Sequence, residues 1–377
     1  MAKVTVVKKK YRIKGGDFVL TALVAALVVF GIIMVFSASY YASISETGDP
    51  YDYLKSNLMW AGVGTVAMIV CTLLDYHVYK KLAPWLMGIS FILLLLIFTP
   101  LGLTRNNATR WLGVEGFPIT LMPGEIAKIC AIIFVAWFLS QNPKRIHQFW
   151  KGVLPLVLLA GAYFVLILKQ PNMSTALTLL MIIVGMMFVA GLSWWYVAAA
   201  VGAAGGGFAV LWFFFPDSYF MDRILSFTDP FADPLGDGWQ VTQGLLALGS
   251  GGLFGKGLGK SIQKTLYLPE PQNDFILAII GEELGFVGCF LLIAVYLVLI
   301  WRCCHICLNA PDLFGTLLAS GITIMLALQV ILNIAVVTSS MPPTGIALPF
   351  ISYGGNSLLI FMASMGILLN ISRHSAK

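Results

Sequence analysis

Apolar runs of membrane length recur along almost the entire chain, and no other feature constrains its fold more. Each run holds roughly 18 or more residues, which lets a helix cross a hydrocarbon core about 30 Å thick. The chain is 59% hydrophobic and 11% charged, with a mean hydropathy of +0.89, whereas a soluble globular chain averages about 25% charged. The sequence therefore predicts an all-α polytopic membrane protein.

Hydropathy windows predict about ten transmembrane helices. They cover residues 18–36, 58–74, 82–99, 125–140, 152–168, 173–190, 194–215, 275–300, 314–337 and 357–371. Residues 1–17 form a basic tail, and 18–377 form a single membrane domain with one long loop, 216–273, between the seventh and eighth helices. The first helix lacks a small-residue cleavage site and is expected to stay as an anchor.

Basic residues concentrate on the side of the membrane that holds both termini, given an even number of helices. Besides the lysines of the tail, they include Lys80, Lys81, Lys144, Arg145 and Lys151. The positive-inside rule then places both termini in the cytoplasm and the long loop outside. The net charge of +6 is thus explained by the orientation of the protein in the membrane, and we expect no nucleic-acid partner.

The long loop ends on Asp274, at the mouth of a helix that carries Glu282 and Glu283 about two turns deeper. Carboxylates are costly in a membrane helix and are usually functional there. At 100° per residue, a stripe of small residues lies below Asp274, namely Ala278, Gly281, Gly285 and Gly288. The stripe predicts close helix packing or the wall of a groove that a lipid tail or sugar approaches, and both can hold, since a tight packing face below can support an open mouth above.

Glu125 and Lys128 stand three residues apart on one face of the fourth predicted helix. Opposite charges at this spacing pair with each other. Two interpretations follow: a structural ion pair, or a cation for an anionic lipid headgroup that Glu125 holds in place.

Two outer segments between helices are candidates for contact with a lipid substrate. In residues 103–113, Arg110 and Trp111 suit the headgroup level, so Trp111 is either a surface anchor or a substrate contact. Residues 341–355 are dense in Pro and Gly. Such non-helical backbone near a membrane persists only where protein or a water-filled cavity covers it, which predicts a cavity wall.

A glycine-rich stretch, residues 248–261, contains Gly259-Lys260-Ser261 but is no Walker A motif, because Phe254 stands where that motif needs glycine. Its backbone N–H groups either cradle a pyrophosphate as an anion nest or merely turn the chain. The four histidines lie on or near the cytoplasmic side, so acid–base chemistry outside must use carboxylates.

At these positions the chain resembles the SEDS family (shape, elongation, division and sporulation proteins). The matching segments are Arg110-Trp111, residues 223–227, 233–234, 238–240, 247–252, 257–259, 263–264, 267–270, 274–275, 280–285 and 339–355. Gly238-Trp239-Gln240 and residues 257–264 are closer to the division branch (FtsW) and its sporulation relative than to the elongation branch (RodA).

The resemblance implies a glycosyltransferase of the bacterial cytoplasmic membrane that polymerises lipid II, an undecaprenyl-pyrophosphate-linked disaccharide-pentapeptide, into peptidoglycan. Asp274 aligns with the essential carboxylate of the family. It is the candidate general base for the acceptor hydroxyl, and also a candidate ligand for a divalent cation, Mg²⁺ or Mn²⁺, that steadies the leaving pyrophosphate. No organic cofactor is expected.

The other candidate site residues bind or orient the substrate. The cations expected to hold the diphosphate are Arg110, Lys128, Arg223 and Lys264. Trp111 stacks on a sugar or on the prenyl chain, and Glu125 and Glu282 position the cations.

Two further functions remain open from the sequence: a flippase for the lipid-linked precursor, and a non-catalytic scaffold of the division machinery. The outward crowding of acidic and Gly-rich segments and the lack of mirrored broken helices disfavour transport. The expected partners are a class B penicillin-binding transpeptidase and other division proteins.

Overall fold

Long apolar helices make up most of the chain in the computed structural model. The model describes residues 16–105, 108–113, 120–196 and 238–375, with short pieces at 198–199, 202 and 205–206. The helices are α1 Phe18–Thr47, α2 Asp52–Leu73, α3 His77–Leu96, α4 Pro123–Gln141, α5 Leu154–Leu168, α6 Met173–Val189, α9 Trp239–Ser250, α10 Ile276–Leu308, α11 Leu313–Val337 and α12 Gly355–His374. A 3₁₀ turn, Pro143–His147, and a π-helical turn, Phe149–Val153, precede α5.

Every predicted helix that falls on described residues is present, which confirms the all-α membrane fold. Eight described helices are long and apolar enough to cross a membrane, and α6 is apolar but shorter. The predicted seventh helix, 194–215, lies mostly outside the described residues, as does the first part of the long loop, so the total of ten stays a prediction. The basic tail, residues 1–17, lies almost entirely outside them too.

The first helix is longer than hydropathy indicated, because the more polar residues after position 36 continue the helix. It continues past residue 36 to Thr47 and stops at Gly48, which adopts φ 75° and donates its N–H to the Ile44 carbonyl. A left-handed glycine of this kind is a common helix C-cap. Similarly, α10 runs to Leu308 rather than residue 300.

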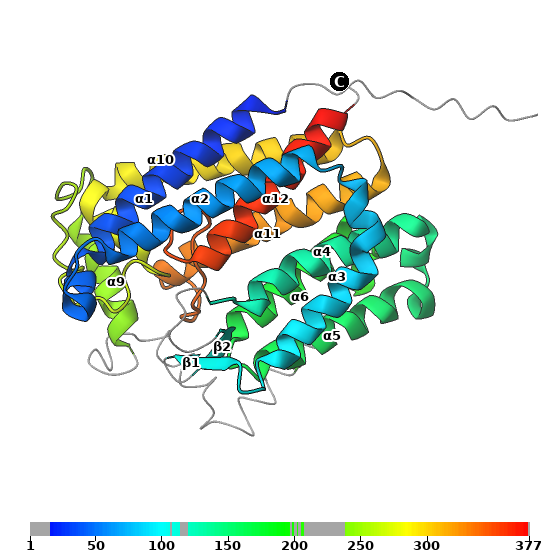
Figure 1. Cartoon of the computed structure of the whole chain (residues 1–377), viewed down its shortest axis with the longest axis horizontal. Helices are drawn as coiled ribbons and strands as arrows, with labels where there is room; N and C mark the ends of the chain where they lie inside the picture. Colours follow the sequence, from blue (N-terminus) through cyan, green and yellow to red (C-terminus); the bar gives the residue numbers. More distant parts are fainter. Residues whose placement is uncertain are drawn as a thin grey trace, which may run out of the picture.

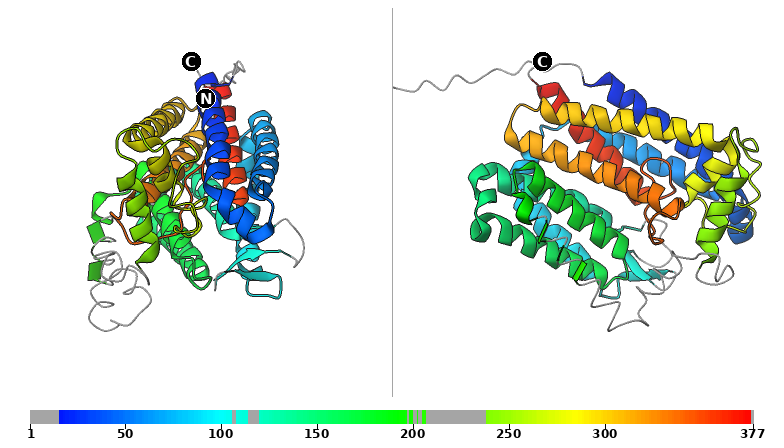
Figure 2. Two further views of the ribbon diagram at one scale, coloured as in Figure 1. Left: turned by 90° about the vertical axis from the view of Figure 1, so that its left-hand side faces the viewer. Right: turned by 180° about the vertical axis from the view of Figure 1, so that it is seen from behind.

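The helices form two groups that lie side by side (Figure 1). One group holds α1, α2, α10, α11 and α12, and the other holds α3 to α6. The contacts of α11 with both α4 and α6 join the groups. Seen from behind (Figure 2), α9 sits at the end of α10 that is far from the C-terminus.

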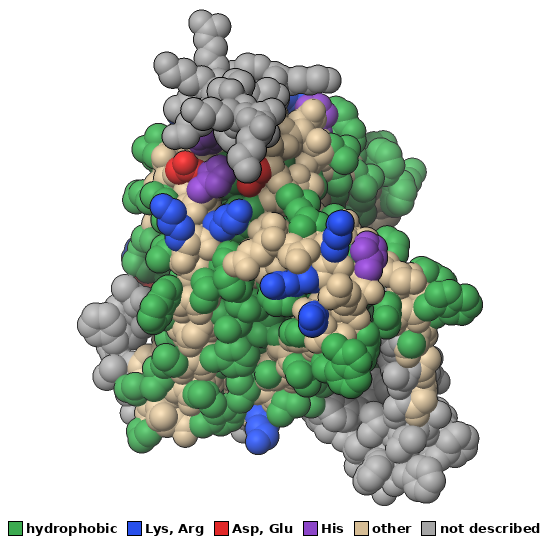
Figure 3. All heavy atoms as spheres, turned by 90° about the vertical axis from the view of Figure 1, so that its right-hand side faces the viewer, with side chains coloured by type: hydrophobic (Ala, Val, Ile, Leu, Met, Phe, Trp, Pro, Cys, Tyr) green, Lys and Arg blue, Asp and Glu red, His purple; other side chains and the backbone are tan. Residues whose placement is uncertain are grey.

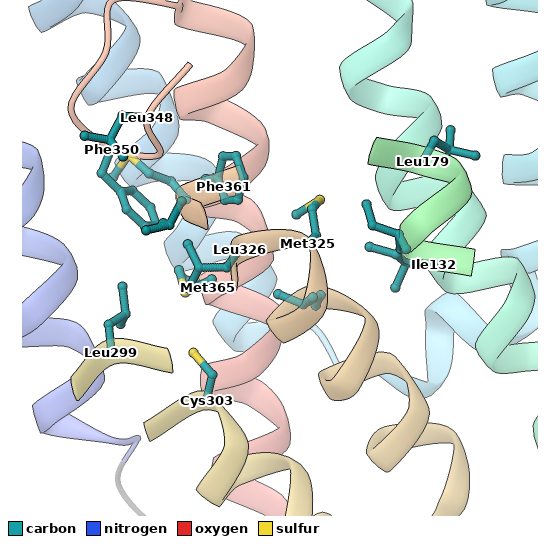
Figure 4. Packing of buried hydrophobic residues seen from close by; sticks show 14 of the residues in the cluster. Ile132, Leu179, Leu299, Cys303, Met325, Leu326, Leu348, Phe350, Phe361 and Met365 are labelled. Carbon is teal, nitrogen blue, oxygen red and sulfur yellow. The ribbon is translucent and has the colours of Figure 1, made fainter. Parts of the chain in front are cut away.

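The buried hydrophobic core lies where these helices pack against one another (Figure 4). Ile132 of α4 and Leu179 of α6 meet on one side of Met325 in α11. On the other side, Phe361 of α12 packs with Phe350, whose ring centroid is 5.7 Å away. Side chains from the segment between α11 and α12 thus help to fill the core, which fixes that segment in place.

A small β-hairpin lies in the outer segment between α3 and α4, for which the sequence predicted no strands. Strands β1 Gly102–Arg105 and β2 Ala108–Leu112 pair antiparallel, with Leu103 opposite Trp111. Leu112 also pairs with Leu121, next to the start of α4. The alternation that marks a strand is too short here for sequence periodicity to detect.

The small-residue stripe lies on one face only if the helix is regular from Asp274 onward, but α10 contains a break. Gly285 has φ 70° and ψ −169°, and a side chain there would collide with the backbone of Gly255 and Leu253. At Gly281, the side chain of Leu248 fills the space where a Cβ would project. At these two positions the stripe is a packing surface, and the groove interpretation of the rest of the stripe stays a prediction.

Basic side chains gather at the end of the molecule that carries the C-terminus (Figure 3). Exposed lysines include Lys81, near the start of α3, and Lys144 and Lys151, in the turns between α4 and α5. Arg302 of α10 pairs with Asp17 at the same end, with 2.6 Å between Nε and Oδ2. This distribution agrees with the charge bias used to predict the orientation.

Candidate functional site

A polar cavity of about 620 Å³ opens at the other end of the molecule. It lies between the two helix groups, and residues from α1, α2, β2, α4, α6, α11 and the start of α12 line it, together with the segment before α10. A cavity of this size lies within the usual range for small-molecule sites.

The predicted ion pair of Glu125 and Lys128 lines this cavity from α4. The two side chains are only 8% and 3% exposed, and Lys128 Nζ donates to Glu125 Oε1 at 2.8 Å and to Gln329 Oε1 at 3.1 Å. Among the described residues, Glu125 Oε2 has no hydrogen-bond partner. A buried charged oxygen is costly to leave without a donor, so this atom suits a ligand that donates a hydrogen bond.

Hydroxyl groups of α6 face the ion pair across the cavity. Ser174, Thr175 and Thr178 line this wall. The side chain of Asn172 accepts a hydrogen bond from the Thr175 N–H and caps α6. A Cβ at Gly124 would lie 3.0 Å from Thr175 Cγ2, so this glycine lets α4 and α6 approach closely beside the ion pair.

Asp274 stands where the long loop meets α10, beside the cavity. Its carboxylate Oδ2 would be 3.5 Å from a Cβ placed on Gly345, and both Gly345 and Asn273 line the cavity. The carbonyl of Asp274 accepts a hydrogen bond from Asn333 Nδ2 at 2.7 Å. The structure thus brings Asp274, Glu125 and Lys128 around one cavity, although they come from distant parts of the sequence.

The breaker-rich segment 341–355 contributes a wall of the cavity, as the sequence indicated, through residues 345–347 and 353–355. Its backbone is non-helical, and Phe350 has φ 68°. Tyr353 donates its N–H to the Gln272 carbonyl at 2.8 Å, and the Leu348 N–H donates to Ser352 Oγ at 2.7 Å. Protein contacts therefore satisfy much of this irregular backbone, which is the condition for its survival near a membrane.

The hairpin contributes Trp111 to the cavity lining. Its neighbour Arg110 turns elsewhere and donates from Nη2 to the carbonyl of Pro171, in the turn between α5 and α6. Arg110 therefore links the hairpin to the turn between α5 and α6, and its role as a diphosphate ligand stays a prediction. Arg223 lies outside the described residues.

Lys264 and Glu282 belong to a different cluster, which the sequence did not separate from the cavity. Lys264 Nζ lies 2.6 Å from Glu283 Oε1 and donates to Ser37 Oγ at 3.0 Å. Glu282 pairs with Lys256 at 2.7 Å. Neither Lys264 nor Glu282 lines the cavity, because the loop descends beside α10 and engages these charges there.

A nest for an anion lies just after the glycine-rich stretch 248–261, and the anion is the carboxylate of Glu282. The N–H groups of Ile262 and Gln263 donate to it at 3.0 and 3.2 Å, and so does the hydroxyl of Ser261. Within the stretch, the N–H groups of Lys256 and Gly257 donate to the carbonyls of Glu282 and Glu283. These donors are used inside the protein, so the pyrophosphate nest in residues 248–261 stays a prediction without support from them.

Two amides of α11 belong to the site but escaped the sequence analysis. Gln329 contacts Lys128, and Asn333 contacts Asp274. Their signal was available, since polar residues four apart in an apolar span mark a face that is not lipid-facing.

Comparisons with known proteins agree over nearly the whole chain. A family model described as "Cell cycle protein" (FtsW, RodA and SpoVE) matches residues 18–377. A probable peptidoglycan glycosyltransferase FtsW from Geobacter sp. (strain M18) is 40% identical over 363 residues, which is 96% of this chain and 98% of the relative. Stage V sporulation protein E from Bacillus subtilis (strain 168) is 42% identical over 360 residues, 95% of this chain and 97% of the relative.

Solved structures show the same fold. A chain from a structure described as "Structural coordination of polymerization and crosslinking by a peptidoglycan synthase complex" matches with a TM-score of 0.78 and 29% identity, covering 96% of this chain and 99% of that one. The rod shape determining protein RodA of Thermus thermophilus matches with a TM-score of 0.70 and 29% identity, covering 96% of this chain and 98% of RodA.

Proposed function

This chain belongs to the SEDS family, the cell cycle proteins that include FtsW, RodA and SpoVE, and from that membership we propose that it is a peptidoglycan glycosyltransferase. It polymerises lipid II into β-1,4-linked glycan strands at the outer face of the bacterial cytoplasmic membrane, for division or for a sporulation septum. The observation that carries the proposal is one polar cavity lined by Glu125 and Lys128, with Asp274 against its wall at Gly345.

The proposed reaction inverts the donor sugar. The acceptor hydroxyl forms a bond to the anomeric carbon of the donor, the bond from that carbon to the pyrophosphate oxygen breaks, and the hydroxyl proton passes to Asp274. A carboxylate within hydrogen-bond reach of the attacking hydroxyl is the group that this step needs. Asp274 is partly exposed, next to Asn273 and Gly345, which line the cavity, and this supports access by a substrate.

Lys128 supplies positive charge for the diphosphate of the lipid. An ammonium has three donors, and Lys128 directs Nζ to Glu125 and Gln329. Only 3% of the Lys128 side chain is exposed, so its ammonium has lost much of its hydration and a further anionic partner would stabilise it. We assign Trp111, on the same cavity wall, to a sugar or prenyl contact.

A divalent cation fits this site only as an ion shared with the substrate. No group of three or more His, Cys, Asp or Glu that would cage a metal exists among the described residues. Mg²⁺ commonly binds through one or two carboxylates plus substrate phosphates, and Asp274 offers one carboxylate. Such an ion would neutralise charge on the leaving pyrophosphate. Glycan synthesis that is lost with a chelator and restored by Mg²⁺ or Mn²⁺ would support this arrangement, and full activity with the chelator would exclude it.

The likeness to a peptidoglycan synthase complex supports a partner that cross-links the strands, and we propose a class B penicillin-binding transpeptidase with a single membrane span. The basic end of the molecule in Figure 3 supports termini in the cytoplasm. The cavity, at the opposite end, then faces the side where lipid II is polymerised.

The decisive experiment compares lipid II polymerisation by the wild type and by Asp274→Asn, each purified with the transpeptidase. We expect glycan strands from the wild type and at least about 10²-fold less from the variant, because the general base is lost. The matched control is Asp312→Asn, at the opposite end, where the side chain caps α11 and asparagine also caps helices. Equal glycan from the wild type and Asp274→Asn would refute the role of Asp274.

A further inference from the structure

Two buried amides form a ladder on one face of α11. Gln329 and Asn333 are one helical turn apart, so their side chains lie on the same face. They are 2% and 0% exposed. Buried amides in an apolar helix are costly unless hydrogen bonds compensate them, so their contacts show what they stabilise.

Asn333 joins the backbone of Asp274 to the cavity wall. Its Nδ2 donates to the Asp274 carbonyl and to the Ile346 carbonyl, each at 2.7 Å. Both protons of one amide are thus used, and the two acceptors come from segments that are about 70 residues apart in the sequence. Ile346 follows Gly345, which lies against the Asp274 carboxylate. The amide therefore fixes both the backbone under Asp274 and the wall beside it.

Gln329 makes the corresponding connection one turn away. Its Oε1 accepts from Lys128 Nζ at 3.1 Å, and its Nε2 approaches the Ala347 carbonyl at 3.5 Å. The second contact is long for a hydrogen bond. Even so, both amides bridge a charged residue of the site to adjacent residues of the same wall segment.

We propose that Gln329 and Asn333 are positioning residues that set the placement of Lys128 relative to Asp274. This inference rests on the proposed function, since it assigns the two amides to the same site. Asn333 holds the base in line with the acceptor hydroxyl, and Gln329 orients the ammonium toward the diphosphate. A misplacement of about 1 Å in such an arrangement costs on the order of 10²-fold in rate.

The alternative is that Gln329 and Asn333 only stabilise the packing between segments. Asn370 provides the matched control, because it makes the same kind of contacts without touching the cavity. It is 2% exposed, accepts from the Tyr76 N–H at 2.9 Å and donates to the Thr72 carbonyl at 2.8 Å. Its loss therefore damages stability to a similar degree and leaves the site intact.

The test measures kcat, KM for lipid II and Tm for Asn333→Asp and Asn370→Asp in complex with the transpeptidase. Aspartate keeps the volume of asparagine but removes the donated hydrogen bonds. For Asn333→Asp we expect kcat to fall about 10- to 100-fold with KM changed less than about threefold, which is the pattern of a group that acts in the transition state. For Asn370→Asp we expect a similar loss of Tm with kcat within about threefold of the wild type.

The second variant, Gln329→Met, removes the contact to Lys128 at similar volume. We expect it mainly to raise KM, about 5- to 20-fold, because Lys128 holds the diphosphate in both ground and transition states. If Asn333→Asp fails to fold, Asn333→Ala and Asn370→Ala replace the first pair.

Three outcomes are distinguishable. Inactive wild-type complex, or a fully active Asp274→Asn variant, contradicts the proposed function itself. An inactive Asp274→Asn together with Asn333 and Asn370 variants that lose activity only in proportion to Tm refutes the positioning role alone. The expected split, with kcat affected at position 333 and KM at position 329, supports it.

Discussion

At the scale of single residues, the buried charges divide into two clusters with different surroundings. Glu125 and Lys128 adjoin the cavity, and one oxygen of Glu125 has no protein partner among the described residues. Glu283 and Lys264 are enclosed by protein, with 0% and 3% of their side chains exposed. The first pair is open to a ligand, whereas the second is closed by its own loop, so only the first is expected to affect the reaction directly.

A double substitution tests whether the ion pair of Glu125 and Lys128 is needed for the reaction or only for stability. Lys128→Met alone leaves Glu125 buried and uncompensated, which we expect to destabilise the fold by about 3–5 kcal/mol. Glu125→Gln together with Lys128→Met removes both charges and is expected to restore most of that stability. The measurements are Tm and glycan synthesis by the purified complex.

The expected result is a folded double variant without glycan synthesis. A double variant that folds and polymerises lipid II at the wild-type rate would show that the pair is only a structural ion pair. The matched control is the exposed pair of Lys55 and Asp49, 2.6 Å apart, where neutralisation should change Tm very little because surface pairs contribute about 0–1 kcal/mol.

At the scale of elements, the most unusual feature is the contact between the break in α10 and the descending loop. The N–H groups of Phe286 and Val287 donate to the carbonyls of Gly252 and Leu253. Because Gly285 is non-helical, the helix exposes backbone donors that a regular helix would use internally. The loop satisfies them, so break and loop depend on each other.

Gly285→Ala is expected to loosen this contact. The new Cβ collides with the backbone of Gly255, and φ of 70° is strained for alanine. We expect a loss of more than about 1 kcal/mol and faster hydrogen exchange in residues 251–267. Gly161→Ala in α5, where no atom lies within 4 Å of the added Cβ, should leave both quantities unchanged. Equal exchange in the two variants would contradict the dependence of the loop on Gly285.

The sequence predicted the elements that depend on local pattern and missed those that depend on distant contacts. Hydropathy located the helices to within a few residues at most ends, and the carboxylate at the start of α10 was identified from its cost in a membrane. The loop's descent beside α10, which gives Lys264 to Glu283, depends on the break at Gly285. No local propensity indicates where a left-handed glycine will meet another segment.

At the scale of the whole molecule, basic side chains gather at one end (Figure 3), and the polar cavity lies at the other. This asymmetry predicts which end an impermeant thiol reagent reaches. In a background with Cys304, the exposed native cysteine, changed to serine, Lys144→Cys should react only in inverted vesicles. Thr99→Cys, an exposed position beside the hairpin, should react in intact cells stripped of any outer membrane. The reverse pattern would overturn the proposed orientation.

The contacts of Glu283 bear on how the molecule moves. Its carboxylate accepts from Ser37 of α1 and from Lys264 of the loop, each within 2.8 Å, and Glu283 itself belongs to α10. Three segments are therefore joined at one buried group, and we expect them to move together. If the proposed function holds, we then expect any widening of the cavity to come from the helices on the opposite side, relative to α1, α10 and the loop.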